Sequence, residues 1–322
     1  MSWAASFQAY EDVCRRAPSA HNTQPWVLRY ADDVVDVHWD PERVLPDSDP
    51  TRRDLFLSLG AFVETCLIVA ASAGLPVRAE VAVDHAALRA ACLVRAPSLY
   101  DTPFTVASVQ QRGCARGGYA RGVLDPGTLA ALTGLGADLR QLPSRDLVAP
   151  LAEADRWMFG TPAVVNELRS WLRLSPKHPR YHLDGLTARA MALSRIEAAG
   201  LAALIAPSAY PVTSRLGAPA LLAAASRGTL RYDGGVLVLV GRAATPEAVI
   251  EHGRALVRVW LTLSERGWCV HPLSQLLDCA TTAAALASQL GLAPHESPLA
   301  VFRTGRPLEA PIRSARIPAS QI

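Results

Sequence analysis

The sequence predicts an α+β fold built from two related halves. Strand-like alternating stretches are interspersed with helical patterns, and 50% of the residues are hydrophobic whereas 19% are charged, so most segments can bury an apolar face. Two long helical segments, 60–75 and 253–268, each begin with glycine and carry another glycine fourteen residues later. We therefore divide the chain into halves at 1–104 and 105–322. Chance similarity between two amphipathic helices is the alternative explanation.

The first half combines helices with short strands. Its opening residues have helical periodicity that ends at a loop containing proline, and the next stretch has the β-branched alternation of two strands around a turn at 31–33. An apolar helix then ends at Gly74, as helices often do. The expected elements are a helix over 2–16, two strands within 26–40, a helix at about 54–73, and strands near 78–83 and 91–94.

The second half repeats this alternation after the polar, glycine-rich segment 109–122. A proline in the first turn and glycines at the end mark its first helix, and a fully apolar run marks a buried strand. The expected elements are a helix over 125–136, a strand over 137–143, helices within 145–167 and 187–206, a strand over 234–242 and a helix over 246–267.

The apolar helix at 54–73 is expected to lie in the core rather than in a membrane. It contains Glu64, begins at Asp54 and stops at a Gly-Leu-Pro sequence. The first sixteen residues carry Glu11 and Asp12 and lack the basic-then-apolar pattern of a signal peptide. We therefore expect a cytoplasmic protein without a membrane partner.

Composition excludes several classes of function. Lys177 is the only lysine and lies in a loop-like segment, which argues against Schiff-base chemistry. The arginines are scattered and nearly balanced by acids, for a net charge of +3, which argues against nucleic-acid binding. The six cysteines show no metal-ligand spacing, so no metal is expected. Motifs for P-loops, nucleophile elbows and zinc proteases are also absent.

The decapeptide APSAHNTQPW (17–26) places many hydrogen-bonding side chains between two prolines. It resembles a motif of the flavin-dependent nitroreductase family. With LPDSDPTRRDLFLSLGAFVE (45–64) it looks like the Acg-type branch, in which one chain holds two nitroreductase-like halves in place of a homodimer. The resemblance implies a three-layer α+β sandwich, with a mostly antiparallel sheet between helices and FMN at the interface of two pseudo-symmetric halves.

The resemblance also implies which residues hold the phosphate of FMN. RGCARGGY (112–119) matches the family's basic segment, so Arg112 corresponds to the phosphate arginine and Arg116 to the basic residue near the pyrimidine edge of the flavin. Cys114 stands where the family has serine or threonine, which weakens one phosphate hydrogen bond. SARIP (314–318) matches the C-terminal phosphate clamp and implies that Ser314 and Arg316 bind the phosphate.

Two other segments are expected to line the flavin. HPLSQ (271–275) matches the loop whose backbone amide points at flavin N5. The decapeptide belongs to the other half and reaches across the interface to the ring. The implied lining residues are Leu273, Ser274, Gln275, Pro18, Ser19, Ala20 and Asn22. His21 and His271 lie near this site and are candidates for substrate binding, whereas no catalytic side chain is assigned because the flavin carries the hydride. The first half lacks the matching segments, so one FMN per chain is expected.

From these observations we predict that the protein is an FMN-dependent oxidoreductase that acts on a small molecule. It could reduce a nitroaromatic or quinone with NADH or NADPH, or it could be a biosynthetic dehydrogenase. The alternative is a flavin-storage protein without turnover, whose pocket is covered by the segment LRLSPKHPRYHLDGL (172–186). A scaffold that has lost the flavin through changes such as Cys114 is a third possibility. The chain could act as a monomeric pseudo-dimer or form a further homodimer.

Overall fold

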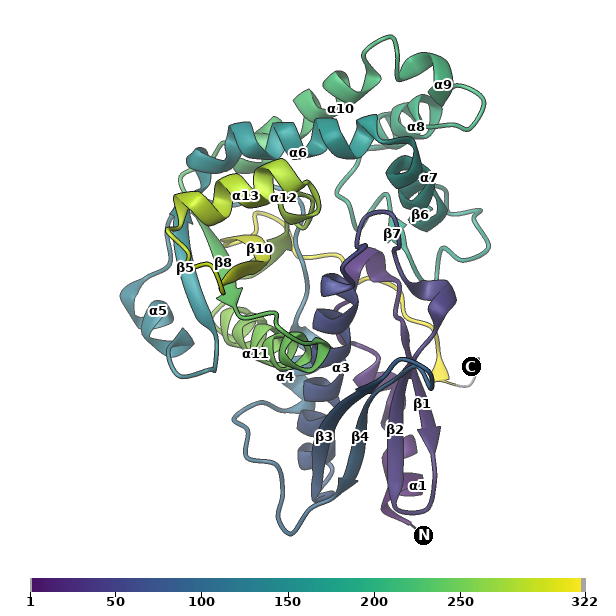
Figure 1. Cartoon of the computed structure of the whole chain (residues 1–322), viewed down its shortest axis with the longest axis vertical. Helices are drawn as coiled ribbons and strands as arrows, with labels where there is room; N and C mark the ends of the chain where they lie inside the picture. Colours follow the sequence, from purple (N-terminus) through teal and green to yellow (C-terminus); the bar gives the residue numbers. More distant parts are fainter. Residues whose placement is uncertain (1, 320–322) are drawn as a thin grey trace.

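The computed structural model describes residues 2–319 and contains two four-stranded sheets (Figure 1). The first has the strand order β1-β2-β4-β3, and the second has the order β5-β8-β10-β9. Neighbouring strands are antiparallel in both sheets. The predicted α+β class is therefore confirmed. One sheet lies within 1–104 and the other within 105–322, although the proposed relationship between these two halves stays a prediction.

The elements of the first segment follow the predicted order. They are α1 (Trp3–Gln8), α2 (Glu11–Cys14), η1 (Ala20–Asn22), β1 (Trp26–Tyr30), β2 (Val34–Trp39), η2 (Pro41–Arg43), α3 (Arg53–Ser72), β3 (Val77–Asp84) and β4 (Arg89–Arg95). Trp26, which begins β1, is buried and stacks on Phe62 of α3 with ring centroids 4.6 Å apart. This tryptophan is therefore a core residue, as its inward position in the hairpin suggests.

The second segment contains more elements than the sequence patterns indicate. They are α4 (Val106–Gln111), α5 (Pro126–Leu132), β5 (Asp138–Pro143), η3 (Ser144–Leu147), α6 (Val148–Gly160), α7 (Pro162–Trp171), β6 (Leu172–Arg173), β7 (Leu186–Thr187), α8 (Arg195–Leu204), α9 (Tyr210–Thr213), α10 (Ala218–Ser226), η4 (Arg227–Leu230), β8 (Gly235–Gly241), α11 (Pro246–Glu265), β9 (Cys269–Pro272), α12 (Gln275–Asp278), α13 (Ala280–Gln289) and β10 (Ser297–Gly305).

Two of the predicted helices are wrong in part. The helix expected over 2–16 is divided into α1 and α2 by a turn at 9–10. The helix expected over 187–206 begins only at Arg195, where Ser194 and Glu197 form a capping box. The preceding residues form turns, and Ala192 has a φ of 56° that no helix accommodates. Periodicity alone could not show these local interruptions.

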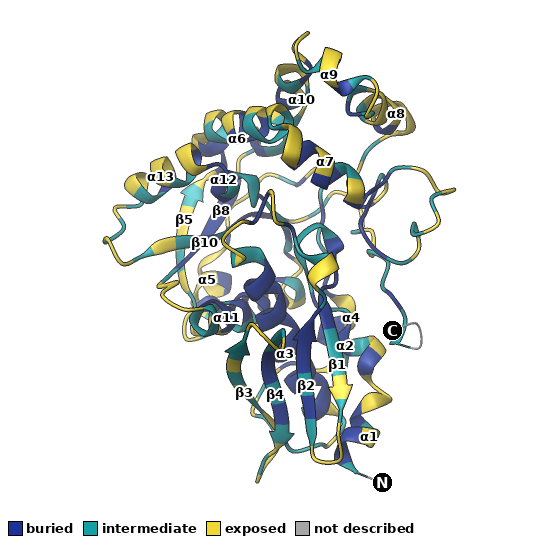
Figure 2. Cartoon of the chain, turned by 45° about the vertical axis from the view of Figure 1, so that its right-hand side comes forward, coloured by how far each residue is buried: buried dark blue, intermediate teal, exposed yellow. Residues whose placement is uncertain are grey.

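Helix α3 lies in the centre of the molecule. By length and hydropathy it is the one candidate membrane span in residues 2–319, but 89% of its most apolar window is buried within the fold (Figure 2). Its side chains form a core with the hairpin and with Val249 and Ile250 of α11. The expected core role of this helix is therefore confirmed by its burial.

Helices α3 and α11 cross at Gly60 and Gly253, the glycines that begin the two similar segments. A Cβ atom on Gly60 would lie 2.0 Å from the carbonyl oxygen of Ile250, and one on Gly253 would lie 2.3 Å from that of Leu57. Gly60 thus contacts Ile250, three positions before Gly253, and Gly253 contacts Leu57, three positions before Gly60. This reciprocal contact has the self-complementary form of an interface across a two-fold axis.

The second sheet is covered on both faces. Along β8, Val236, Val238 and Val240 pack on one side, with α6, α12 and α13. Leu237 and Leu239 pack on the other side, with α11. This alternation gives the second segment three layers, helices, sheet and helices.

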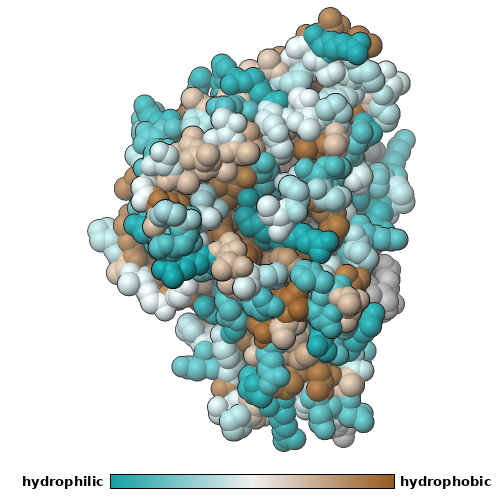
Figure 3. Space-filling model, in the orientation of Figure 1, coloured by the Kyte–Doolittle hydropathy of each residue, from teal (hydrophilic) through white to brown (hydrophobic). Residues whose placement is uncertain are grey.

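Helices α8, α9 and α10 extend beyond the sheets at the upper end of Figure 1. Several large apolar side chains of this arm are exposed, and apolar surface is visible at the same end of the space-filling view (Figure 3). They are Ile196, Val212, Leu216 and Leu221.

Candidate functional site

Four arginines from three distant segments lie close together, and none of them pairs with a carboxylate of residues 2–319. Arg16 follows α2, Arg112 follows α4, and Arg313 and Arg316 belong to the C-terminal segment that returns to the first half (Figure 1). Burial, Arg313 and Arg112 together lower the pKa of Arg16 to about 10. Burial and the charges of Arg16 and Arg112 hold the pKa of Arg316 well below its usual value. No ion pair within residues 2–319 includes any of the four.

Backbone carbonyl groups hold these arginines in place. Arg316 donates from Nε to the carbonyl oxygen of Arg15 at 2.6 Å and from Nη2 to that of Ala17 at 3.0 Å. Arg112 donates to the carbonyl oxygen of Arg16 at 3.1 Å, and Arg16 donates to that of Ser314 at 3.2 Å. Carbonyl groups orient the guanidinium groups but cannot neutralise them, and the buried Nε of Arg16 has no partner among the described residues. A multiply charged anion such as a phosphate fits this donor set.

The loop that precedes β1 has an unusual backbone. His21, Asn22 and Gln24 have φ values of 46°, 55° and 52°. These values lie in the left-handed region, which residues other than glycine rarely occupy. The N–H of Gln24 donates to Ser19 Oγ at 2.9 Å, and the N–H of Ala20 donates to Ser58 Oγ at 3.3 Å. Strain of this kind persists only where surrounding contacts maintain it, and it is common at functional sites.

The side chain of Asn22 joins this loop to two remote segments. Its Oδ1 accepts a hydrogen bond from Arg316 at 2.8 Å, and its Nδ2 donates to the carbonyl oxygens of Ala315 at 3.1 Å and Gly185 at 3.2 Å. Gln24 acts similarly: it accepts from the N–H of Ile317 and donates to the carbonyl oxygen of Leu183, both at 2.9 Å. The loop therefore holds together the arginine cluster and the segment 172–186.

Comparison with known proteins was made at the levels of family, sequence and structure. No family model matches the chain. Two curated proteins from Mycobacterium tuberculosis strains, whose names give NAD(P)H nitroreductase as a candidate activity, are 41% identical over 59 residues. The chain is similar to nitroreductases. The match covers 18% of this chain and spans only 17% of each relative's length.

Solved nitroreductase structures also align with the chain, at low similarity. A Parabacteroides distasonis protein, whose name gives NADH dehydrogenase or NAD(P)H nitroreductase as candidate activities, has a TM-score of 0.39 and 11% identity. The alignment covers 67% of this chain and 96% of that protein. The FMN- and NADPH-dependent NfnB of a Sphingopyxis strain has a TM-score of 0.38 and 17% identity, with coverages of 66% and 92%. A Bacteroides fragilis nitroreductase with bound FMN has a TM-score of 0.37 and 13% identity, with coverages of 67% and 96%.

His21 and His271, the two histidines of the predicted site, are both near Arg116. Burial lowers the pKa of His21 to about 4, with a further lowering by Arg116 that Asp54 opposes. Burial and the charges of Arg116 and Arg303 hold the pKa of His271 well below its ordinary value. Arg116, which donates to the carbonyl oxygen of Ala190 at 3.3 Å, is therefore close to both. Both histidines are neutral in this environment.

The buried Arg303 orients His271. Its Nε donates to His271 Nδ1 at 3.0 Å, while its Nη2 donates to the carbonyl oxygens of Arg116 at 2.8 Å and Gly117 at 2.7 Å. Its guanidinium also lies 4.4 Å from the centre of the Tyr119 ring. Because Nδ1 of the neutral imidazole accepts, Nε2 carries the proton and can donate a hydrogen bond.

The nitroreductase-like loop 271–275 is anchored from both sides. The N–H of Leu273 donates to the carbonyl oxygen of Val301 in β10 at 2.8 Å, and the Leu273 side chain is buried. The Gln275 side chain donates to Asp155 of α6 at 3.1 Å. Within residues 2–319, the N–H groups of Ser274 and Gln275 have no acceptor. These two backbone amides remain available for a ligand, together with the Nε2–H of His271.

The structure brings most predicted site residues into two neighbourhoods. Arg112, Ser314 and Arg316 meet around Arg16, and Cys114 lies beside Arg112 with 3.8 Å between Arg112 Nη1 and Sγ. Pro18 and Ala20 flank Ser19 in the loop and are half-buried. The roles of all these residues in flavin binding stay predictions. Four contributors were not predicted from the sequence: Arg16, Gln24, Arg303 and Arg313. Of these, Arg16 had a usable signal, because it directly precedes the decapeptide.

The segment 172–186 is fixed by a buried carboxylate. Asp184 accepts hydrogen bonds from Arg43 at 3.0 Å, from Arg173 at 2.9 Å and from Arg180 Nε at 2.8 Å. These guanidinium groups lower the pKa of Asp184 despite its burial. Arg43 also donates to the carbonyl oxygen of Thr23. The segment is therefore bound to the strained loop by charged as well as neutral hydrogen bonds.

Replacement of Asn22 tests this connection. If this site binds FMN, as the nitroreductase resemblance implies, Asn22→Ala should weaken FMN binding about tenfold, because Arg316 loses one orienting acceptor and Gly185 loses its donor. Alanine is also strained at a φ of 55°, so Asn22→Gly is the matched variant that removes the side chain while tolerating the backbone. Flavin fluorescence titration measures both. If Asn22→Gly binds FMN as tightly as the unmodified protein, the side chain has no part in the site.

Proposed function

We propose that the chain is an FMN-dependent oxidoreductase of the nitroreductase type that acts on a small organic molecule. The observation that carries this proposal is the arginine cluster, whose unneutralised charge and unpartnered Arg16 Nε suit the phosphate of FMN. When bound, FMN supplies two-electron hydride chemistry. The short sequence match to nitroreductases supports the same proposal.

Under this proposal, each neighbourhood of the site has one task. Arg16 and Arg112 donate to the phosphate, with Ser314 beside them. Arg313 and Arg316 add charge, because the N–H groups of Arg316 already donate to protein oxygens. The free amides of Ser274 and Gln275 hydrogen-bond the flavin near N5. Arg116 stabilises negative charge on the pyrimidine edge. The loop 18–22 covers the ring, and because both polar atoms of the Asn22 amide have protein partners, its main task is to hold Arg316.

The neutral histidines are suited to binding substrate. His271 presents its Nε2–H in an orientation set by Arg303 and can donate a hydrogen bond to a substrate oxygen. His21 belongs to the strained loop, and its Nδ1 is buried without a partner. Neutral imidazoles beside Arg116 avoid repulsion between cations in this part of the site. NADH or NADPH is the proposed electron donor for the reductase direction.

The alternative is a flavin-storage protein, and the segment 172–186 favours it. This segment is bound to the loop through Gly185 and Leu183 and is fixed by the three arginines around Asp184. A segment held this firmly over the flavin would exclude substrate.

The reciprocal contact of Gly60 and Gly253 supports the further proposal that the halves 1–104 and 105–322 form a pseudo-dimer with one FMN, as in the Acg-type branch. We propose a cytoplasmic protein for which nucleic acid and membrane are not partners.

One spectroscopic experiment separates these functions. We expect the purified protein, or protein supplied with FMN, to show a flavin spectrum that NADH or NADPH bleaches and that air restores. Bleaching by dithionite but by neither nicotinamide would exclude the reductase. A reductase also requires turnover with a nitroaromatic or a quinone. Protein that binds no FMN would contradict both the oxidoreductase and the storage function.

A further inference from the structure

Three further arginines line a cavity of the second segment, between α6 and η4. A cavity of about 380 Å³ is formed by the first turns of α6 and by the η4 segment, and its lining residues are Val148, Ala149, Ala152, Arg156, Arg227 and Arg231. None of these residues belongs to the arginine cluster at Arg16 or to the loop 271–275. The volume lies within the range of pockets that hold small molecules.

The three arginines of this cavity lack acidic partners. No ion pair within residues 2–319 involves Arg156, Arg227 or Arg231. The acids nearest in sequence are engaged elsewhere. Asp155 is buried and accepts hydrogen bonds from Ser226 and Gln275, and Asp233 pairs with two other arginines. Glu153 does not line the cavity. The cavity therefore presents three exposed guanidinium groups that have no acidic partner within residues 2–319.

The shape and chemistry of the cavity define a ligand class. Three guanidinium groups that share one concavity can donate to several oxygens of one dianion, which suits a phosphate better than a single carboxylate. The wall formed by Val148, Ala149 and Ala152 has no charged group and can pack against an apolar part of the same ligand. We propose that this cavity binds a phosphate-bearing small molecule.

The cavity adjoins the candidate flavin site through one helix. Arg156 follows Asp155, which contacts Gln275 of the loop 271–275, and Arg227 follows Ser226, which donates to the same carboxylate. Two sources of the phosphate fit this position. One is the 2′-phosphate of NADPH, the donor in the proposed reductase reaction, and the other is a separate phosphorylated ligand. The binding site itself does not depend on the proposed flavin function.

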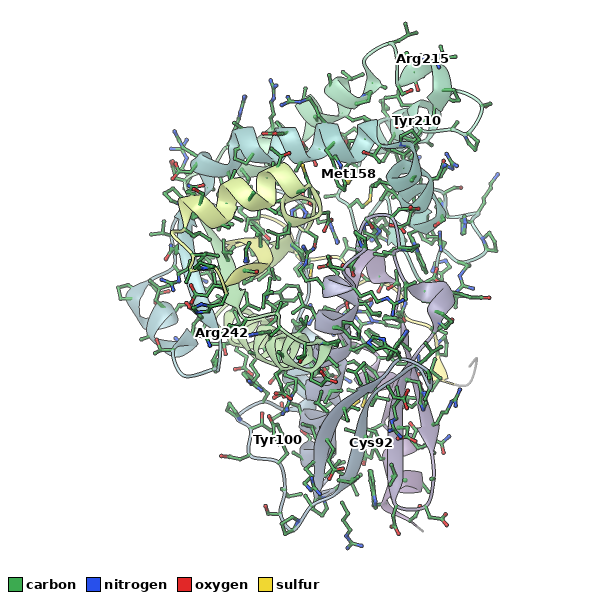
Figure 4. The ribbon with its side chains drawn as sticks, viewed as in Figure 1. Cys92, Tyr100, Met158, Tyr210, Arg215 and Arg242 are labelled. Atoms are coloured by element: carbon green, nitrogen blue, oxygen red, sulfur yellow. The ribbon has the colours of Figure 1, made fainter. Side chains whose placement is uncertain are left out.

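Calorimetric titration of the full chain, saturated with FMN, with inorganic pyrophosphate tests the site. We expect saturable binding that the double variant Arg227→Ala/Arg231→Ala weakens at least tenfold. The matched control is Arg215→Ala/Arg242→Ala, which removes the same charge. Arg215 precedes α10, whereas Arg227 follows the other end of that helix. Arg242 follows β8, whereas Arg231 precedes the other end of that strand (Figure 4). Absence of saturable binding, an unchanged affinity in the first variant or equal losses in both would overturn the proposal.

Competition identifies the source of the phosphate. If NADPH displaces pyrophosphate and NADH does not, the ligand is the phosphorylated nicotinamide. If neither displaces it, the cavity serves a separate phosphorylated ligand. If the chain binds no FMN, the same titration is run on the flavin-free protein, and the difference between the two double variants still identifies the cavity. Failure of the flavin proposal and failure of this one are thus distinguishable.

Discussion

The double variant Arg16→Gln/Arg112→Gln is expected to lose FMN affinity by about 100-fold or more. Hydrogen bonds to charged groups contribute about 1.5–3 kcal/mol each, and the variant removes two such donors from the phosphate. The flavin-free protein should respond in the opposite direction. Because the cluster has no carboxylate within residues 2–319 and its members repel one another, removing two charges should leave the stability of the flavin-free protein unchanged or raise it.

Two measurements separate this effect from simple unfolding. FMN fluorescence quenching gives the affinity, and thermal unfolding without FMN gives the stability. The matched control is Arg78→Gln/Arg140→Gln, whose arginines form exposed ion pairs with Glu80 and Asp138 and should change neither quantity much. An unchanged FMN affinity, or a flavin-free protein that is much less stable, would contradict a phosphate site built from the cluster.

The variant Gly60→Ala is expected to lower stability by about 3 kcal/mol or more and the midpoint of thermal unfolding by roughly 6 °C or more. The added Cβ would lie 2.0 Å from the carbonyl oxygen of Ile250 and 2.8 Å from its carbonyl carbon. These are backbone atoms of another long helix, so no side-chain rotation can relieve the clash. The helices α3 and α11 must separate, which disrupts the cores on both sides of the crossing.

Gly200→Ala in α8 is the control for this prediction. A Cβ atom there meets nothing within 4 Å, so alanine should stabilise the helix by up to about 1 kcal/mol. Gly253→Ala should resemble Gly60→Ala, because the contact is reciprocal. If Gly60→Ala unfolds at the same temperature as the unmodified protein, the close crossing of the two helices is wrong.

The first segment was predictable from the sequence because its signals are local. The hairpin within 26–40 shows the alternation that pairs Trp26 with Trp39, and the long apolar helix ends at Gly74 as expected. Helices α9 and α10 and the strand β10 were not recognised. The two helices expose apolar residues that blur the helical pattern, and the residues of β10 pair with residues thirty or more positions away, which local periodicity cannot reveal.

The candidate site could be predicted only as a set of separate segments. Motif similarity singled out Arg112 and Arg316, but Arg16 becomes part of the site only when the C-terminal segment lies beside it. Arg303 could not be predicted either, because its role depends on its contacts with His271 and with the carbonyl group of Arg116. No spacing in the sequence encodes such contacts, because they are created by packing between distant elements.

The contacts between residues 314–317 and residues 15–24 also determine when the candidate site can form. Arg316 donates to the carbonyl groups of residues 15–17, and Ile317 donates to Gln24, so these segments hold each other in place although they are far apart in the sequence. During synthesis, residues 15–24 lack these partners until residues 314–317 have left the ribosome. Because the arginine cluster contains residues of both segments, an anion that binds there stabilises the state in which the two segments are joined.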